Sequence, residues 1–132
     1  MQTGKFWLFI LLAVLLSFTS CDPGHSVKMM IHNDSSVPLK LNYKTRTKDS
    51  TITIGAYSSV DALHFGGIGS GKEYNCCPCE FLEVTLQTTD ASLSVTKDIL
   101  DPENWNITNP NKRRFSSKEI NCEFRVTQSD IQ

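Results

Sequence analysis

The chain has 132 residues, of which 39% are hydrophobic and 20% charged, with 13 Lys and Arg against 14 Asp and Glu. This length fits one small domain and excludes a large enzyme, while seven Phe, three Tyr and two Trp supply enough apolar surface to disfavour wholesale disorder. A formal net charge of -1 leaves no excess of positive charge for a phosphate backbone, so we do not expect nucleic acid as a partner.

Residues 1–20 have the pattern of a signal peptide. Lys5 is the only charged residue among them, and the unbroken apolar run FWLFILLAVLL follows it from Phe6 to Leu16. As a helix this run would span about 16 Å, roughly half the hydrocarbon thickness of a bilayer, so a permanent transmembrane helix is the poorer interpretation. We therefore expect residues 1–20 to be cleaved off.

The apolar run continues into the sequence SFTSCD, in which small polar residues directly precede Cys21. Here the chain resembles a bacterial lipoprotein precursor, and the ending in Ser-Cys is similar to Bacteroidetes-type lipoproteins, although Phe18 replaces the usual aliphatic residue. The resemblance implies that Cys21 is lipidated and becomes the first residue of the mature protein. Two or three acyl chains, at about 0.8 kcal/mol per buried CH₂, would hold a small domain at a membrane. The alternative is ordinary secretory cleavage near Ser20, with Cys21 in a disulfide.

The same resemblance implies a location in the cell envelope, with the lipid in a membrane. We expect the outer rather than the inner membrane, and both a periplasmic and a surface-exposed domain stay open. In this interpretation residues 21–26 are the lipidated cysteine and a short tether, and residues 27–132 form a single domain.

The domain sequence alternates apolar and polar residues at the period of half-buried strands. The alternation predicts strands around residues 27–31, 39–43, 51–54, 82–86, 93–95 and 120–126. The turn-forming sequence Asn-Asp-Ser-Ser at 33–36 indicates that the first two strands form a hairpin. A helical turn or two is expected at most, between Lys97 and Trp105, and residues 104–118 read as one long loop.

Roughly seven short strands with frequent turns predict an all-β fold, a small antiparallel two-sheet sandwich with an immunoglobulin-like architecture. A second resemblance supports this fold class. The sequences MMIHNDS from Met29 and FRVTQSDI from Phe124 are similar to small uncharacterised Bacteroidetes lipoproteins with β-sandwich domains. That resemblance implies an envelope location and a fold, and brings no catalytic residues.

Four cysteines remain in the domain: Cys76, Cys77, Cys79 and Cys122. In an exported protein the first expectation for them is disulfide bonding. Cys79 and Cys122 could join neighbouring strands, Cys76 or Cys77 could pair with Cys122 instead, and Cys122 could also be a plain buried thiol. We expect no metal and no cofactor, because the CCPC run does not match a zinc knuckle and His25, His32 and His64 are scattered.

Other motifs carry weaker signals. The sequence GGIGSGKE from Gly66 approaches a phosphate-binding loop, but Glu73 stands where Ser or Thr should bind magnesium, so a glycine-rich turn between strands is expected. The carboxylates Asp98, Asp101 and Glu103 lack the spacing of a calcium loop and indicate a solvated turn.

No pattern of a nucleophile with its base, or of a metal-binding enzyme, is visible, so we do not expect an enzyme. The sequence favours a lipid-anchored envelope protein that binds a protein or glycan partner or serves as an accessory module. The alternative is a redox or metal-binding envelope protein that uses Cys76, Cys77, Cys79 and Cys122.

Overall fold

A computed structural model describes residues 24–68, 76–108 and 118–132 of the chain. The predicted signal peptide and Cys21 lie outside these residues. The described part is all-β, with seven strands in two sheets, three short 3₁₀ turns and no α-helix. Within it, no helix has the length and apolarity that crossing a membrane requires.

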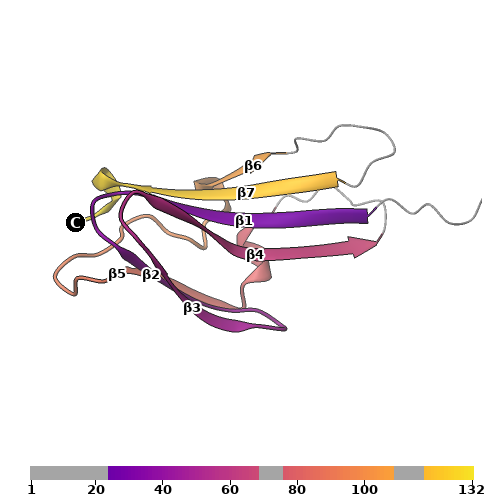
Figure 1. Cartoon of the computed structure of the whole chain (residues 1–132), viewed down its shortest axis with the longest axis horizontal. Helices are drawn as coiled ribbons and strands as arrows, with labels where there is room; N and C mark the ends of the chain where they lie inside the picture. The colour runs from indigo at the N-terminus through magenta and orange to yellow at the C-terminus, as the bar shows by residue number, and fades with distance from the viewer. Residues whose placement is uncertain (1–23, 69–75, 109–117) are drawn as a thin grey trace, which may run out of the picture.

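The larger sheet has four strands in the order β4-β1-β7-β6. Its strands are β4 (Ser58–Ile68), β1 (Gly24–Asp34), β7 (Lys118–Thr127) and β6 (Trp105–Thr108). β1 runs antiparallel to β4 and parallel to β7, and β6 is antiparallel to β7. The long strands β4, β1 and β7 lie side by side in Figure 1.

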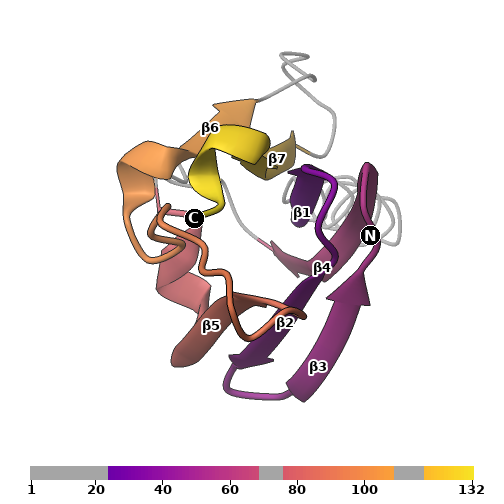
Figure 2. The same cartoon turned by 90° about the vertical axis from the view of Figure 1, so that its left-hand side faces the viewer.

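The smaller sheet has three antiparallel strands in the order β3-β2-β5. They are β3 (Asp49–Ile54), β2 (Leu39–Lys44) and β5 (Glu83–Thr88). The 3₁₀ turns are η1 (Pro78–Glu80), η2 (Pro102–Asn104) and η3 (Gln128–Asp130). Figure 2 shows the two sheets as separate layers, and one cluster of buried apolar side chains draws on both of them.

The alternation in the sequence explains how the layers are built. Every second residue of β1 and of β7 is buried, and the residues between them face outward. β2 supplies the facing side of the core in the same way. Burying each such side chain contributes about 1.5–3 kcal/mol, which holds the sheets together. The fully or almost fully buried members are Val27, Met29, Ile31, Leu39, Leu41, Tyr43, Ile120, Cys122, Phe124 and Val126.

The expectation of two sheets is met, but the expectation that all pairing is antiparallel is wrong. β1 and β7 pair in parallel along their length, from His25 opposite Lys118 to Asp34 opposite Thr127. Alternation could not reveal this, because a half-buried strand shows the same period whichever way its neighbour runs. The larger sheet is therefore mixed.

The predicted hairpin is also wrong, because β1 and β2 belong to different sheets. The turn around Asn33 carries the chain from one layer to the other. The stretch around residues 93–95 forms only a single bridge, between Val95 and Ile131, and the expected helical turns reduce to η2. The predicted long loop begins with a strand, since Trp105–Thr108 is β6.

Strand β4 was not predicted from the sequence, because a β-bulge breaks its alternation of apolar and polar residues. Its register against β1 shifts between Met29 and Met30, so Ala62 is an extra residue in β4. Val60 precedes the bulge on the core face, and Leu63 follows it on the same face, although the two residues differ by an odd number. A bulge of this kind reverses the phase of a period-two pattern, and the pattern then no longer reads as a strand.

The bulge is tied to the opposite sheet by a buried hydrogen bond. The hydroxyl of Tyr43 in β2 donates to the carbonyl oxygen of Ala62 at 2.6 Å, and both residues are 2% exposed. Because the bulge takes the Ala62 backbone out of the regular ladder, the tyrosine supplies a partner for a buried carbonyl.

Replacing Tyr43 by phenylalanine is expected to lower the free energy of unfolding by about 1–2 kcal/mol, since the ring stays and only the bond to Ala62 is lost. Urea unfolding of the two proteins measures this. The exposed Tyr57 offers the matched control, because Tyr57→Phe should change stability by less than about 0.5 kcal/mol. Equal stability of Tyr43→Phe and wild type would contradict the assignment.

Candidate functional site

The four domain cysteines form two disulfides, Cys77–Cys122 and Cys76–Cys79. Of the pairings left open by the sequence, Cys77 rather than Cys79 is the partner of Cys122. The first bond joins the segment around η1 to the central strand β7, across 45 positions of the sequence. The second closes a turn of separation 3. With all four sulfurs paired, none of them is a free thiolate ligand for a metal.

The two disulfides differ in their surroundings. Cys77 and Cys122 are both 0% exposed and belong to the core cluster, whereas Cys79 is exposed and Cys76 is half-buried. By the chain-entropy relation, a bridge that spans 45 residues stabilises the fold by about 4 kcal/mol, and one that spans three contributes less than half as much. The buried bridge therefore carries most of the structural role.

The spacing of the second bridge is a signal that the sequence analysis overlooked. Two residues, Cys77 and Pro78, separate Cys76 from Cys79, so the run CCPC contains a C-x-x-C pair. Cys77 lies between the two members of this pair and bonds to Cys122 in β7 instead, so the three neighbouring cysteines did not read as one pair and a separate cysteine. Such pairs are typical of thiol–disulfide exchange centres as well as of metal sites.

Several contacts fix the cysteine segment on the domain. Pro78 is buried, and the backbone N–H of Phe81 donates to its carbonyl oxygen at 3.1 Å. The Phe81 ring lies against Tyr43 at 5.6 Å and against Trp105 at 6.4 Å between ring centroids. The backbone N–H of Leu82 donates to the carbonyl oxygen of Lys44 at 2.8 Å. The exposed disulfide is therefore attached to a buried aromatic cluster and to the end of β2.

A groove of about 340 Å³ opens beside Cys79. Its lining combines apolar side chains of β4 with the turn between β2 and β3, and Leu82, which also lines it, is 59% exposed. Two opposite charges, on Arg46 and Glu80, also line it. The full lining is residues 45–47, Leu63, Phe65, Cys79, Glu80 and Leu82.

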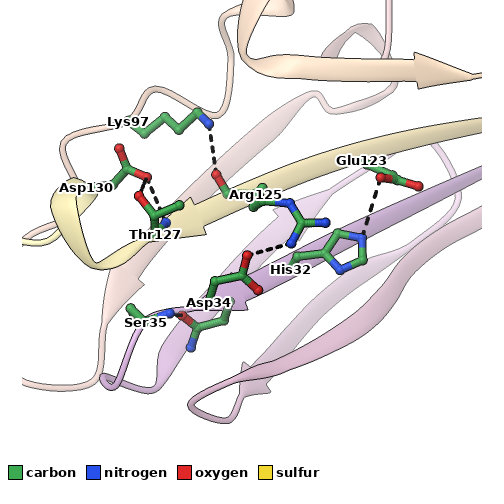
Figure 3. A network of polar contacts seen from close by, with 9 residues as sticks. His32, Asp34, Ser35, Lys97, Glu123, Arg125, Thr127 and Asp130 are labelled. Atoms are coloured by element: carbon green, nitrogen blue, oxygen red, sulfur yellow. Dashed lines mark hydrogen bonds and ion pairs between the residues drawn. The ribbon is translucent and has the colours of Figure 1, made fainter.

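A second group of polar side chains occupies the outer face of the larger sheet (Figure 3). Arg125 of β7 donates to the Asp34 carboxylate of β1 at 2.5 Å, and His32 lies 3.9 Å from the Glu123 carboxylate. Lys97 donates to the backbone carbonyl oxygen of Arg125 at 2.9 Å. These side chains are a fifth to a half exposed, so each ion pair contributes about 0–1 kcal/mol. The group mainly fixes the ends of β1 and β7 beside each other.

The carboxylate of Asp130 caps the end of β7 (Figure 3). Burial acts to raise its pKa, but hydrogen bonds from the backbone N–H and hydroxyl of Thr127, both at 2.8 Å, and the charge of Lys97 outweigh this effect. The pKa of Asp130 therefore lies below its ordinary value of 3.8. A lowered pKa in the folded state means that the stabilisation is complete above the ordinary value and is lost as the pH falls through the folded pKa.

Asp130→Asn is expected to lower the free energy of unfolding by about 0.5–1 kcal/mol at pH 7, a capping effect reduced by solvent exposure. The difference from wild type should shrink below about pH 4, because the wild-type carboxylate loses its charge as the pH falls through its lowered pKa. Urea titrations at several pH values measure it. Ser129→Ala keeps the carboxylate and should retain the wild-type acid dependence, and a pH-independent difference for Asp130→Asn would contradict the assignment.

The other sequence motifs have structural roles, as far as they lie within the described residues. Asp98 and Asp101 accept hydrogen bonds from the backbone N–H groups of Leu100 and Glu103, at 2.8 and 2.9 Å, and so close local turns. Gly66 and Gly67 lie inside β4 rather than in the expected turn, and a Cβ at Gly67 would stand 2.7 Å from the His25 ring. Residues 69–73 of this motif lie outside the described residues. Among the described residues, no three or more His, Cys, Asp or Glu side chains gather as metal ligands.

Tyr57 was not singled out in the sequence. It lies in the connection between β3 and β4 with φ of 51°, the one positive value found for a described residue other than glycine, and its side chain is 73% exposed. Its backbone N–H donates to the carbonyl oxygen of Ser35 at 3.1 Å. A bulky residue in left-handed backbone costs energy, and such positions gather at functional sites.

Comparison with protein-family models, with curated proteins and with solved structures found no match to this chain.

Proposed function

We propose that this protein is a membrane-tethered module of the cell envelope, anchored through a lipid on Cys21 in the outer membrane. Its single domain, an immunoglobulin-like sandwich, binds a protein or glycan partner through the end that lies away from the membrane. The observation that carries the proposal is the exposed Tyr57 in left-handed backbone at that end.

The course of β1 supports this orientation. β1 begins at Gly24, three positions after Cys21, so the anchored residue and the start of the strand are adjacent. The 11 residues of β1 then extend for roughly 35 Å to Asp34. Figure 1 shows the C-terminus at this far end, where Tyr57 bonds to Ser35. Two disulfides are also in keeping with an oxidising compartment outside the cytoplasm.

The exposed ring supports a binding role at the far end. An aromatic side chain with few rotatable bonds supplies contact area at a low entropic cost, for a protein surface and for the apolar face of a sugar alike. Glycine would adopt this left-handed backbone conformation without strain, but the sequence has tyrosine here. The ring is 73% exposed, so packing in the core does not account for the tyrosine.

The anchor is tested on protein extracted from its native membranes. We expect an intact mass that corresponds to a chain beginning at Cys21 with added acyl groups, and we expect Cys21→Ser to release the protein into the soluble fraction. An unmodified mature chain in the membrane fraction would contradict lipidation.

The binding surface is tested with a photo-crosslinking phenylalanine analogue at position 57, with the exposed Leu100, at 53% against 73% for Tyr57, as the control position. A protein partner should give a discrete adduct at 57 and none at 100. A glycan partner should instead appear on a glycan array, with at least tenfold weaker binding by Tyr57→Gly, a variant whose backbone tolerates φ of 51°. Equal adducts at both positions, or unchanged binding by Tyr57→Gly, would contradict the proposal.

A further inference from the structure

We infer that Cys76–Cys79 is a thiol–disulfide exchange site, and that Cys79 is the sulfur at which a dithiol of another protein attacks. This inference concerns the opposite side of the domain from Tyr57 and goes beyond the proposed binding function.

The first step of the argument is the division of roles between the two disulfides. Cys77–Cys122 is fully buried and joins distant parts of the fold. The turn of Cys76–Cys79 is already held by the buried Pro78 and by the hydrogen bond from Phe81 to Pro78. The second disulfide therefore adds less to the fold than the first, and its Cys79 is exposed. Accessibility of one sulfur is the condition for exchange with another protein.

The second step is the asymmetry within the exposed pair. Cys79 lies on the surface and lines the groove, whereas Cys76 is half-buried and is not part of the groove lining. An incoming thiolate can therefore reach the sulfur of Cys79 more readily.

The third step is the groove itself. Leu63 and Phe65 line it, together with Cys79 and the exposed Leu82. The exposed Leu82, with Leu63 and Phe65, gives this groove of mixed polarity an apolar part that an apolar side chain of a partner can contact. The partner that fits is a protein dithiol in which apolar residues flank the attacking cysteine.

The exchange balances with these two reactants. A thiolate of the partner attacks the sulfur of Cys79, the Cys76–Cys79 bond breaks, and the sulfur of Cys76 leaves as a thiolate and takes up a proton. The partner's second thiol, as its thiolate, then attacks the partner's sulfur in the mixed disulfide and releases Cys79, which is protonated. The domain gains two electrons and two protons, and the partner is oxidised to a disulfide.

The first test uses the protein produced from the complete reading frame, treated with dithiothreitol and mapped by alkylation and mass spectrometry. We expect Cys76–Cys79 to open at least tenfold faster than Cys77–Cys122, without loss of the fold. Opening of both bonds together, or of neither before unfolding, would overturn the inference. This measurement needs no variant, so it stands even where a cysteine variant fails to fold.

The second test separates the two sulfurs of the pair. The probe is a leucine-rich peptide whose single cysteine is activated with thionitrobenzoate, and the released chromophore reports its attachment. Cys76→Ser leaves Cys79 as the free thiol and should react at least tenfold faster than Cys79→Ser. Equal rates would overturn the assignment of Cys79 as the exchanging sulfur.

The third test addresses the groove. In the Cys76→Ser background, Leu82→Asp should slow the reaction with the leucine-rich peptide about tenfold and leave the reaction with thionitrobenzoate-activated glutathione unchanged. Leu100→Asp removes a leucine of similar exposure elsewhere, 53% against 59%, and should affect neither reaction. A Leu82→Asp variant that behaves like Leu100→Asp would show that the groove does not take part.

Discussion

Replacing both Cys77 and Cys122 by alanine is expected to lower the free energy of unfolding by about 4 kcal/mol, or to prevent folding altogether. The bridge spans 45 positions, so its removal releases a long segment in the unfolded chain. It also removes two sulfurs that are 0% exposed from the core. In a domain of this size such a loss corresponds to a fall of roughly 15–30 °C in the melting temperature, which calorimetry measures.

The matched control is the double variant Cys76→Ala and Cys79→Ala, which removes the other bridge from the same turn. Its expected cost is less than half as large, because the bridge spans three positions and Cys79 is exposed. A larger loss for this control than for the buried pair would contradict the division between a structural and an exposed disulfide.

Asn33→Ala is expected to lower the free energy of unfolding by about 3 kcal/mol or more, although Asn33 contributes no apolar surface. The side chain is 0% exposed, and its amide donates to the carbonyl oxygens of Val37 and Gly55, both at 2.9 Å. Its own oxygen accepts from the backbone N–H and the hydroxyl of Ser35, at 3.1 and 2.7 Å. Each buried group left without a partner costs about 1–3 kcal/mol.

The geometry explains why the effect should be large. Asn33 closes the turn from β1 to β2 and at the same time holds the connection between β3 and β4 through Gly55. One side chain thus joins both sheets at the far end of the domain. Urea unfolding measures the loss, and Asn106→Ala, at an exposed position in β6, should change stability by less than about 0.5 kcal/mol.

The pH dependence of the stability of Asn33→Asp tests whether the Asn33 amide acts as a hydrogen-bond donor. The carboxylate can still accept from Ser35 but has no N–H for Val37 and Gly55, and burial raises the pKa of the introduced carboxyl. Because the folded pKa exceeds the unfolded one, stability should fall as the pH rises above about 4 and recover in acid, where the protonated group can donate one hydrogen bond. A pH-independent loss would contradict the donor role of Asn33.

Part of this fold followed from local pattern. Strands β1, β2, β3, β5 and β7 were expected near their observed positions, because the more buried and the more exposed residues alternate along each of them. Strand β4 was not predicted, since the bulge at Ala62 reverses the phase of its alternation.

Of the candidate sites, too, one was visible in the sequence and one was not. The cysteine cluster was visible in the sequence, whereas Tyr57 was not, because a backbone angle leaves no trace in residue type when the residue is not glycine.

The sequence by itself determined that the domain is all-β, which residues of most strands face the core, and that four cysteines are available for pairing. Its signal peptide and lipidated Cys21 stay predictions. Only the tertiary structure decided that β1 and β7 pair in parallel, that β1 and β2 lie in different sheets, and that Cys77 rather than Cys79 joins Cys122. The physical reason is that periodicity records burial, a local property of each strand. The choice of neighbour depends on contacts between residues far apart in the chain.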